Sequence, residues 1–198
     1  MNIEKALAAL RKNGFSVRYF ATAAEAADAL CAQVQETSVG IGGSMTVQAL
    51  GLYERLSQNN TVYWHWKQPA AEARRLAMGA EVYLLSANAV SETGEIVNID
   101  GAGNRVAAAL FGHKRVYYLV GVNKLAPSLE GAIFRARNIA APLNARRLQC
   151  QTPCALAEPM RCHDCHSPDR ICNAAVVQAR PMGGTQTEVF LIGEELGY

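Results

Sequence analysis

The sequence predicts a three-layer, Rossmann-like α/β domain, in which a mainly parallel sheet is covered by helices on both faces. Short β-branched or aromatic runs alternate with stretches whose apolar residues recur at helical spacing. The run at 115–120 is apolar almost throughout, as buried parallel strands are. A chain of 198 residues suits one domain and allows a full core without disulfides. We therefore expect a single domain over residues 1–198.

The elements of the first half have recognisable ends. Asn2 can cap a first helix, which Gly14 ends, and Thr22 with Glu25 has the spacing of a capping box at the start of a second. Pro69 suits a first helical turn. Further helices are expected at 46–56 and 69–79, and strands at 15–20, 38–41, 61–64 and 81–85.

The pattern changes in the second half. Residues 89–100 are typical of two short strands around a glycine turn, and residues 101–110 of a glycine loop that enters a helix. A helix opening at Pro127 should run through Phe134. The segment 148–180 holds five of the six cysteines and little periodicity, so we expect an irregular, Cys-rich C-terminal lobe there. Strands are expected at 115–120 and 188–192.

Composition excludes several classes of function. The formal charge is +2 without a basic block, which argues against nucleic acid as the main partner. No stretch approaches the ~18 apolar residues of a membrane span. The first residues carry charged side chains and lack the apolar core of a secretory signal, so we expect a cytoplasmic protein. In that compartment cysteines are expected as ligands or thiols rather than as disulfides.

A glycine-rich loop between a predicted strand and a predicted helix is a first candidate site. Glycines let a ligand approach the backbone, and a helix start offers free N–H groups to a phosphate or carboxylate. The loop lacks the lysine of a Walker motif and the third glycine of a dinucleotide fingerprint. The alternative is a tight turn capped by Ser44. The candidate anion-binding residues are Gly42, Gly43, Ser44 and Thr46.

A polar cluster at predicted strand ends is the second candidate. Asp100 and Lys124 are candidate catalytic groups, and Arg105 can hold a carboxylate through two hydrogen bonds. Asn98 and Asn104 are candidate ligand-binding residues beside them. Parallel strands gather their carboxyl ends at one edge, so these side chains should face the same cleft as the glycine loop. The alternative is that the Asn and Asp residues only stabilise turns.

The third candidate is a metal centre in the Cys-rich lobe. Five thiols and two histidines fall within 23 residues, and a C-x2-C pair lets two thiolates reach one metal. The alternative is a group of reduced thiols. We expect Cys150 to be a spare ligand. The four expected ligands, of an iron–sulfur cluster or of zinc, are Cys154, Cys162, Cys165 and Cys172.

These residues together resemble the lactate-utilisation (LUD) family over nearly the whole chain. The matching segments are GIGGSMT at 40–46, ANAVSETGEIVNIDGAGNRVAAALFG at 87–112, GVNKLAP at 121–127, RARNIAAPLNARRL at 135–148 and CHDCHSPDRICN at 162–173. The resemblance implies the three-layer fold of ribose-5-phosphate isomerase, glucosamine-6-phosphate deaminase and coenzyme A transferases. It also implies that the loop at 42–46 lies where the isomerases bind phosphate, with Asp100 and Lys124 near their catalytic acid and lysine.

The functions implied by the resemblance differ in class. The first is a component of bacterial L-lactate utilisation, which oxidises lactate to pyruvate, acting as an electron-transfer or accessory subunit. Its expected partners are the iron–sulfur subunits of that system and a small anionic ligand, with a homodimer left open. This association favours an iron–sulfur cluster over zinc in the lobe. The alternatives are a small-molecule isomerase or transferase that binds a phosphorylated or coenzyme A substrate, and a non-catalytic subunit that organises partners.

Overall fold

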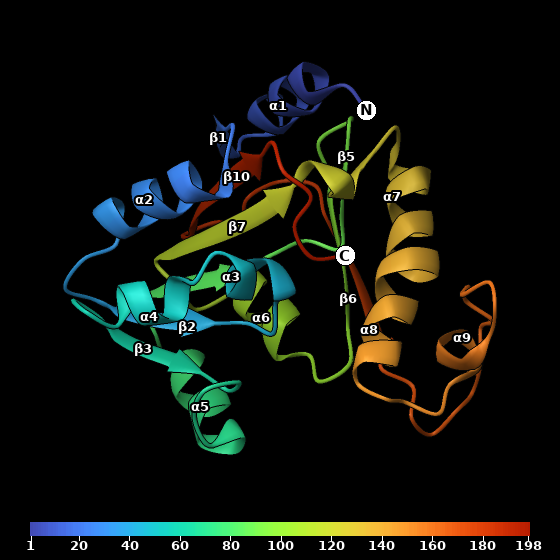
Figure 1. The fold of residues 1–198 in the computed structure, drawn as a ribbon. Helices are drawn as coiled ribbons and strands as arrows, with labels where there is room; N and C mark the ends of the chain where they lie inside the picture. The colour runs from blue at the N-terminus through green and yellow to red at the C-terminus, as the bar shows by residue number, and fades with distance from the viewer.

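A six-stranded, all-parallel sheet forms the centre of the molecule (Figure 1), in a computed structural model that describes residues 1–198. The strand order is β1-β10-β7-β4-β2-β3, and every pairing in it is parallel. The strands are β1 (Ser16–Phe20), β2 (Ser38–Ile41), β3 (Thr61–Trp64), β4 (Val82–Leu85), β7 (Arg115–Gly121) and β10 (Gln186–Ile192).

Helices cover both faces of this sheet, which confirms the predicted three layers. One apolar cluster joins α2, α3 and α4 to one face, and a second joins α1, α5 and α6 to the other. The helices are α1 (Ile3–Lys12), α2 (Ala23–Gln33), α3 (Met45–Ala49), α4 (Leu52–Leu56), α5 (Ala70–Ala77) and α6 (Asn104–Leu110). None of the helices is long and apolar enough to cross a membrane.

The capping residues correctly predicted where the first two helices begin, but the helix expected over 46–56 was predicted incorrectly. The Asn2 side chain accepts from the Lys5 N–H, and the capping box of Thr22 and Glu25 is present. The helix expected over 46–56 is instead two short helices. Gly51, with a φ of 61°, lies in the left-handed region between α3 and α4 and breaks the run.

A small mixed sheet packs beside the main one, with the order β8-β5-β6-β9. Its strands are β5 (Ala89–Ser91), β6 (Ile96–Asp100), β8 (Leu125–Ala126) and β9 (Ala174–Gln178). The segment 148–180 is irregular over residues 157–173, as expected, but it also contains two regular elements. The short helix α9 (Pro153–Leu156) lies near its start, and β9 pairs antiparallel with β6 over five residues near its end.

One continuous helical column covers the small sheet (Figure 1), and it is longer than the sequence predicted. It consists of α7 (Leu129–Arg135), a π-helical turn (Ala136–Ala140) and α8 (Ala141–Arg147). Ala132 and Ala136 pack against the small sheet. The wide π turn ends two residues before Pro142, which lacks a backbone N–H and disturbs regular helical bonding. The column carries α8 to the edge of the main sheet where the candidate site lies.

Candidate functional site

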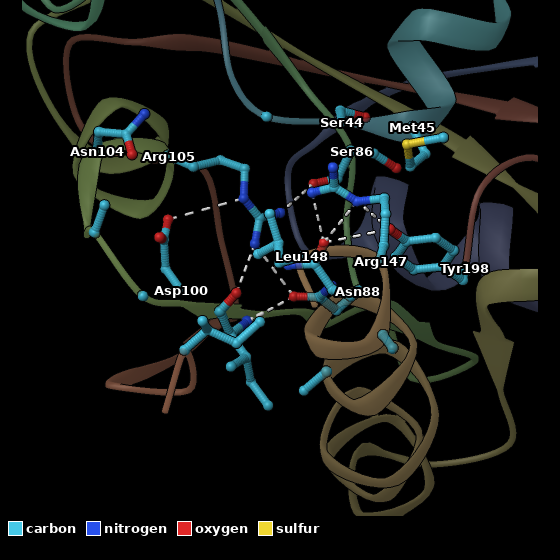
Figure 2. Close-up of a pocket in the computed structure, with 18 of the residues that line it drawn as sticks. Ser44, Met45, Ser86, Asn88, Asp100, Asn104, Arg105, Arg147, Leu148 and Tyr198 are labelled. Atoms are coloured by element: carbon cyan, nitrogen blue, oxygen red, sulfur yellow. Dashed lines mark hydrogen bonds and ion pairs between the residues drawn. The ribbon is translucent and has the colours of Figure 1, made fainter. Parts of the chain in front are cut away.

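A cavity of about 430 Å³ opens where four parallel strands end (Figure 2). Gly43 and Ser44 follow β2, His65 follows β3, Ser86 follows β4, and Lys124 follows β7 through a short 3-10 turn (Val122–Lys124). Residues of α8 and the segment 170–173 form the opposite wall. Open α/β sheets bind ligands at this edge, so the cavity lies where the fold favours a site.

The cavity is strongly cationic. Its basic lining side chains are Arg74, Arg105, Lys124, Arg147 and Arg170, and its one acidic side chain is Asp100. The only ion pair that involves a lining cation joins Arg105 Nε to Asp100 Oδ2 at 3.8 Å. His65 lies half-buried beside Gly43, and burial together with the charge of Arg74 lowers its pKa. Such a surplus of positive charge attracts and holds an anion.

Lys124 is the most deeply buried cation of the cavity, with 3% of its surface exposed. Its Nζ donates to Thr46 Oγ1 at 2.8 Å and to Ser86 Oγ at 2.9 Å, both neutral hydroxyls. Burial first, and then the positive charges of Arg135 and Arg105, lower the pKa of Lys124 to about 7. A large fraction of the Lys124 side chains is therefore a neutral amine near neutral pH.

Arg105 is held by the protein on almost every donor it has. Its Nη1 donates to Ser86 O at 3.2 Å and to Asn98 Oδ1 at 2.8 Å. Its Nη2 donates to Ile99 O at 2.6 Å and to Asn88 Oδ1 at 3.3 Å, as Figure 2 shows in part. Its four terminal N–H groups thus have partners, so Arg105 offers a ligand its charge rather than a free guanidinium fork.

Asp100 is occupied in a similar way. Its carboxylate accepts from the backbone N–H of Gly103 at 3.0 Å and of Val106 at 3.1 Å, at the start of α6. A negative charge at a helix N-terminus is stabilised by the free N–H groups there. Asp100 therefore fixes the glycine loop that leads into α6, and it presents its charge to Arg105.

The rim of the cavity keeps free donors. Arg147 donates from Nε to Tyr198 Oη at 2.6 Å and from Nη2 to Asn144 Oδ1 at 2.9 Å, while its Nη1 makes no hydrogen bond within the protein. Its guanidinium lies 4.9 Å from the centre of the Trp66 ring. Burial raises the pKa of Tyr198, against the opposing charge of Arg147, so this hydroxyl stays protonated. Arg147 therefore keeps one guanidinium nitrogen, Nη1, free to receive a carboxylate.

The structure brings most of the sequence-predicted residues to this one place. Asp100, Asn104, Arg105 and Lys124 line the cavity together with Gly43 and Ser44. The others lie just behind its wall. Gly42 donates its N–H to Leu84 O at 2.9 Å, Thr46 accepts from Lys124, and Asn98 accepts from Arg105. Ser44 Oγ caps α3 by accepting from the Val47 N–H at 3.2 Å, so the capped turn is present. Anion binding by the loop stays a prediction.

Sequence reasoning missed several lining residues, chiefly Ser86, Trp66, Arg147 and Tyr198. Ser86 directly follows β4, so the rule that sites gather at strand ends would have selected it. Arg147 lies within the RARNIAAPLNARRL segment, but nothing local showed that α8 reaches the cavity. His65, which lies between Trp64 and Trp66, is a further lining residue that no sequence motif marked.

The thiols of the lobe do not converge in the structure. No group of three His, Cys, Asp or Glu side chains is arranged to hold a metal ion. Cys172 Sγ instead accepts from Arg170 Nε at 3.1 Å, and Cys154 Sγ lies 3.3 Å from Thr152 Oγ1. Each of the six cysteines is a partly buried free thiol. The four-cysteine centre therefore stays a prediction, and it requires the lobe to rearrange.

Comparison with known proteins agrees with this fold. The family model of the LUD domain matches residues 3–192, so the chain belongs to the LUD domain family, which is associated with lactate utilisation. A solved structure, a DUF162 family protein from Deinococcus radiodurans, superposes with a TM-score of 0.56 at 12% identity and covers 96% of each chain. That likeness concerns the fold alone. A comparison with curated proteins finds no match.

Proposed function

We propose that this chain is a component of lactate utilisation and that its cavity binds a small organic anion. The observation that carries the proposal is the charge of the cavity, where five basic side chains face one carboxylate that is already occupied. A volume of about 430 Å³ suits a small metabolite. Lactate and pyruvate are small carboxylates, which gives the proposal its link to the family.

In this proposal the charged residues of the cavity have different roles. Arg147 receives the carboxylate through its free Nη1. Arg105 and Asp100 keep the cavity wall in shape, and Arg105 adds its positive charge. Lys124 faces the remainder of the ligand from the floor of the cavity, where a group with a pKa near 7 can give or take a proton.

Titration calorimetry with L-lactate, pyruvate and inorganic phosphate tests this proposal. We expect saturable binding of at least one of the two carboxylates, weakened about tenfold or more in Arg147→Ala, since a hydrogen bond to a charged group contributes about 1.5–3 kcal/mol. Arg75→Ala is the matched control, because Arg75 is exposed and does not line the cavity. Equal binding by both variants, or none by the parent protein, would contradict the proposal.

A second candidate function is an isomerase or transferase that uses a phosphorylated or coenzyme A substrate. Gly43 and Ser44 beside the cavity favour it, as does the pairing of an amine, Lys124, with a carboxylate, Asp100, around one space. The same titration with ribose 5-phosphate and coenzyme A separates the candidates. Binding of these compounds in preference to lactate and pyruvate would select the second function.

The Cys-rich lobe belongs to the proposal as a second, metal-binding site. Cys154, Cys162, Cys165 and Cys172 would bind one iron–sulfur cluster or, as the alternative, one zinc ion, with Cys150 as the spare ligand. Support comes from their chemistry, since all are free thiols within a short segment. Iron, zinc and acid-labile sulfide per chain, measured on anaerobically purified protein, test the site. Cys31→Ser is the control and should leave the metal and sulfide content unchanged, because Cys31 packs against the main core and not in the lobe.

The partners proposed for the chain follow from the same reasoning. It would act as an electron-transfer or accessory subunit beside iron–sulfur subunits of a lactate-oxidising system, and a homodimer is the other assembly proposed. Light scattering on the purified chain, alone and mixed with those subunits, distinguishes a monomer, a dimer and a mixed complex. A chain that stays monomeric in both samples would contradict both assemblies.

A further inference from the structure

We propose that Lys124 is a nucleophile that forms an iminium with the carbonyl carbon of a 2-oxo acid held in the cavity. The inference rests on the proposed function, because it requires the cavity to bind a small organic anion. It deepens that function by assigning a substrate class and a covalent step to a residue that otherwise only contributes charge.

The hydrogen bonds of Lys124 suit a neutral amine better than an ammonium ion. Nζ has two acceptors, Thr46 Oγ1 and Ser86 Oγ, and no carboxylate lies within 4 Å of it. Thr46 donates its own hydroxyl proton to Leu196 O at 3.0 Å, so towards Lys124 its oxygen acts only as an acceptor. A neutral amine uses both N–H groups in this arrangement and keeps its lone pair. An ammonium ion would leave a third N–H without a partner in the protein.

The surroundings of Lys124 keep the amine reactive at neutral pH. Burial and the charges of Arg135 and Arg105 hold its pKa at about 7. An exposed lysine, with a pKa near 10.4, is neutral in roughly one molecule in a thousand or fewer at that pH. Desolvated lysines beside other cations are a known type of activated amine. Lys124 should therefore react with a carbonyl compound far faster than the other lysines.

The reaction balances without any oxidant or cofactor. The Nζ lone pair attacks the carbonyl carbon of the 2-oxo acid, the C=O electron pair moves to oxygen, and the proton lost by nitrogen passes to that oxygen. The resulting carbinolamine takes up one further proton on its hydroxyl and expels water, which leaves a C=N⁺ iminium. The Ser86 hydroxyl lies 2.9 Å from Nζ and is placed to relay these protons.

The charges of the cavity select the 2-oxo acid over a simple ketone or aldehyde. The substrate must carry a carbonyl for the amine and an anionic group for the guanidinium ions. Arg147 keeps a free Nη1 at the rim, while Arg105 places a fixed charge in the wall. A carboxylate adjacent to the carbonyl meets both demands within a cavity of about 430 Å³.

Reductive trapping tests the inference. The full chain is incubated at about pH 7 with pyruvate and cyanoborohydride, and the product is examined by intact mass and peptide mapping. We expect one reduced adduct per chain, located on Lys124, and none with L-lactate, which has no carbonyl. Lys114→Arg is the matched control, because Lys114 is exposed and pairs with Glu81 outside the cavity. This control should trap pyruvate as the parent does, and Lys124→Arg should lose the adduct.

The mapping on the parent protein decides the matter even if the Lys124 variant does not fold. An adduct spread over exposed lysines, or retained in folded Lys124→Arg, overturns the inference. Calorimetry run beside the trapping separates the two proposals. Pyruvate that binds without forming an adduct overturns the iminium and leaves the anion site standing, whereas pyruvate that neither binds nor reacts overturns the iminium while lactate binding still decides the anion site.

Discussion

Arg105 and Lys124 are both cations of one cavity, yet the protein stabilises them differently. Arg105 is surrounded by oxygen acceptors and has the Asp100 carboxylate 3.8 Å from its Nε. Lys124 has two neutral hydroxyls and further cations nearby. The protein thus satisfies the donors of Arg105, whereas burial and the neighbouring positive charges lower the pKa of Lys124. Removing the two side chains should therefore have different consequences for stability.

Arg105→Ala should lower the free energy of unfolding by about 2–4 kcal/mol, because it leaves buried acceptors without their donor. Asn98 is 3% exposed and Asp100 is 8% exposed, so water replaces the guanidinium poorly. Urea denaturation measures the loss. Arg74→Ala is the control and should change stability by less than about 0.5 kcal/mol, since Arg74 is exposed and unpaired. Similar losses in both variants would show that Arg105 is not structural.

Lys124→Met should change how stability depends on pH. The pKa of Lys124 is about 7 in the folded protein against 10.5 ordinarily, so between these values the unfolded chain binds one more proton. The free energy of unfolding of the parent must then rise with pH. Relative to Lys124→Met, it should rise by about 1 kcal/mol per pH unit from about pH 7.5 to 9.5. Below pH 7 Lys124 is charged in both the folded and the unfolded chain, so the cost of burying its charge is fully present. The difference in unfolding free energy between the parent and Lys124→Met is then constant. Parallel stability curves over the whole range would refute this.

At the scale of helices and strands, the sequence predicted an element correctly where the contacts that determine it join residues close together in the chain. Asn2 and Thr22 meet acceptor and donor groups three residues away, so their caps could be predicted from spacing. The strand β9 could not be predicted in this way, because its partner β6 lies about 75 residues earlier in the chain. The length of the column from α7 to α8 was missed for the same reason. Its alanines face the small sheet, which the sequence does not place.

The glycine turn between β5 and β6 shows how tightly these elements fit. Gly94 has a φ of 93°, and a Cβ there would lie 2.7 Å from Ala9 C in α1. Gly94→Ala should lower the free energy of unfolding by about 2–4 kcal/mol, through strain and a backbone clash together. Gly184 has a φ of 83° but no atom near its Cβ position, so Gly184→Ala isolates the strain at about 1 kcal/mol. Thermal or urea unfolding compares the two, and equal effects would mean that the contact with α1 is loose.

At the scale of the whole molecule, the sequence predicted those residues of the candidate site that follow the ends of strands. The rule for parallel sheets accounts for Ser44 and Lys124, which follow β2 and β7. Asp100 and Arg105 also line the cavity, but they lie at and after the end of β6, which pairs antiparallel with its neighbours in the small sheet, so that rule does not explain their position. Arg147 reaches the cavity because the helical column spans the small sheet. No spacing in the sequence encodes that distance, so the free guanidinium at the rim was found only in three dimensions.

The position of β10 between β1 and β7 also determines when the protein can fold during its synthesis. The strand made first has no neighbour in the sheet except one that begins at residue 186. While the ribosome is still translating, β1 and the α1 face beneath it must wait with apolar surface exposed, and the closing contact spans about 170 residues. Nascent chains halted before residue 186 should be cleaved readily by protease and bound by chaperones. Chains extended until β10 has cleared the exit tunnel should resist both, because β1 then has its neighbour in the sheet.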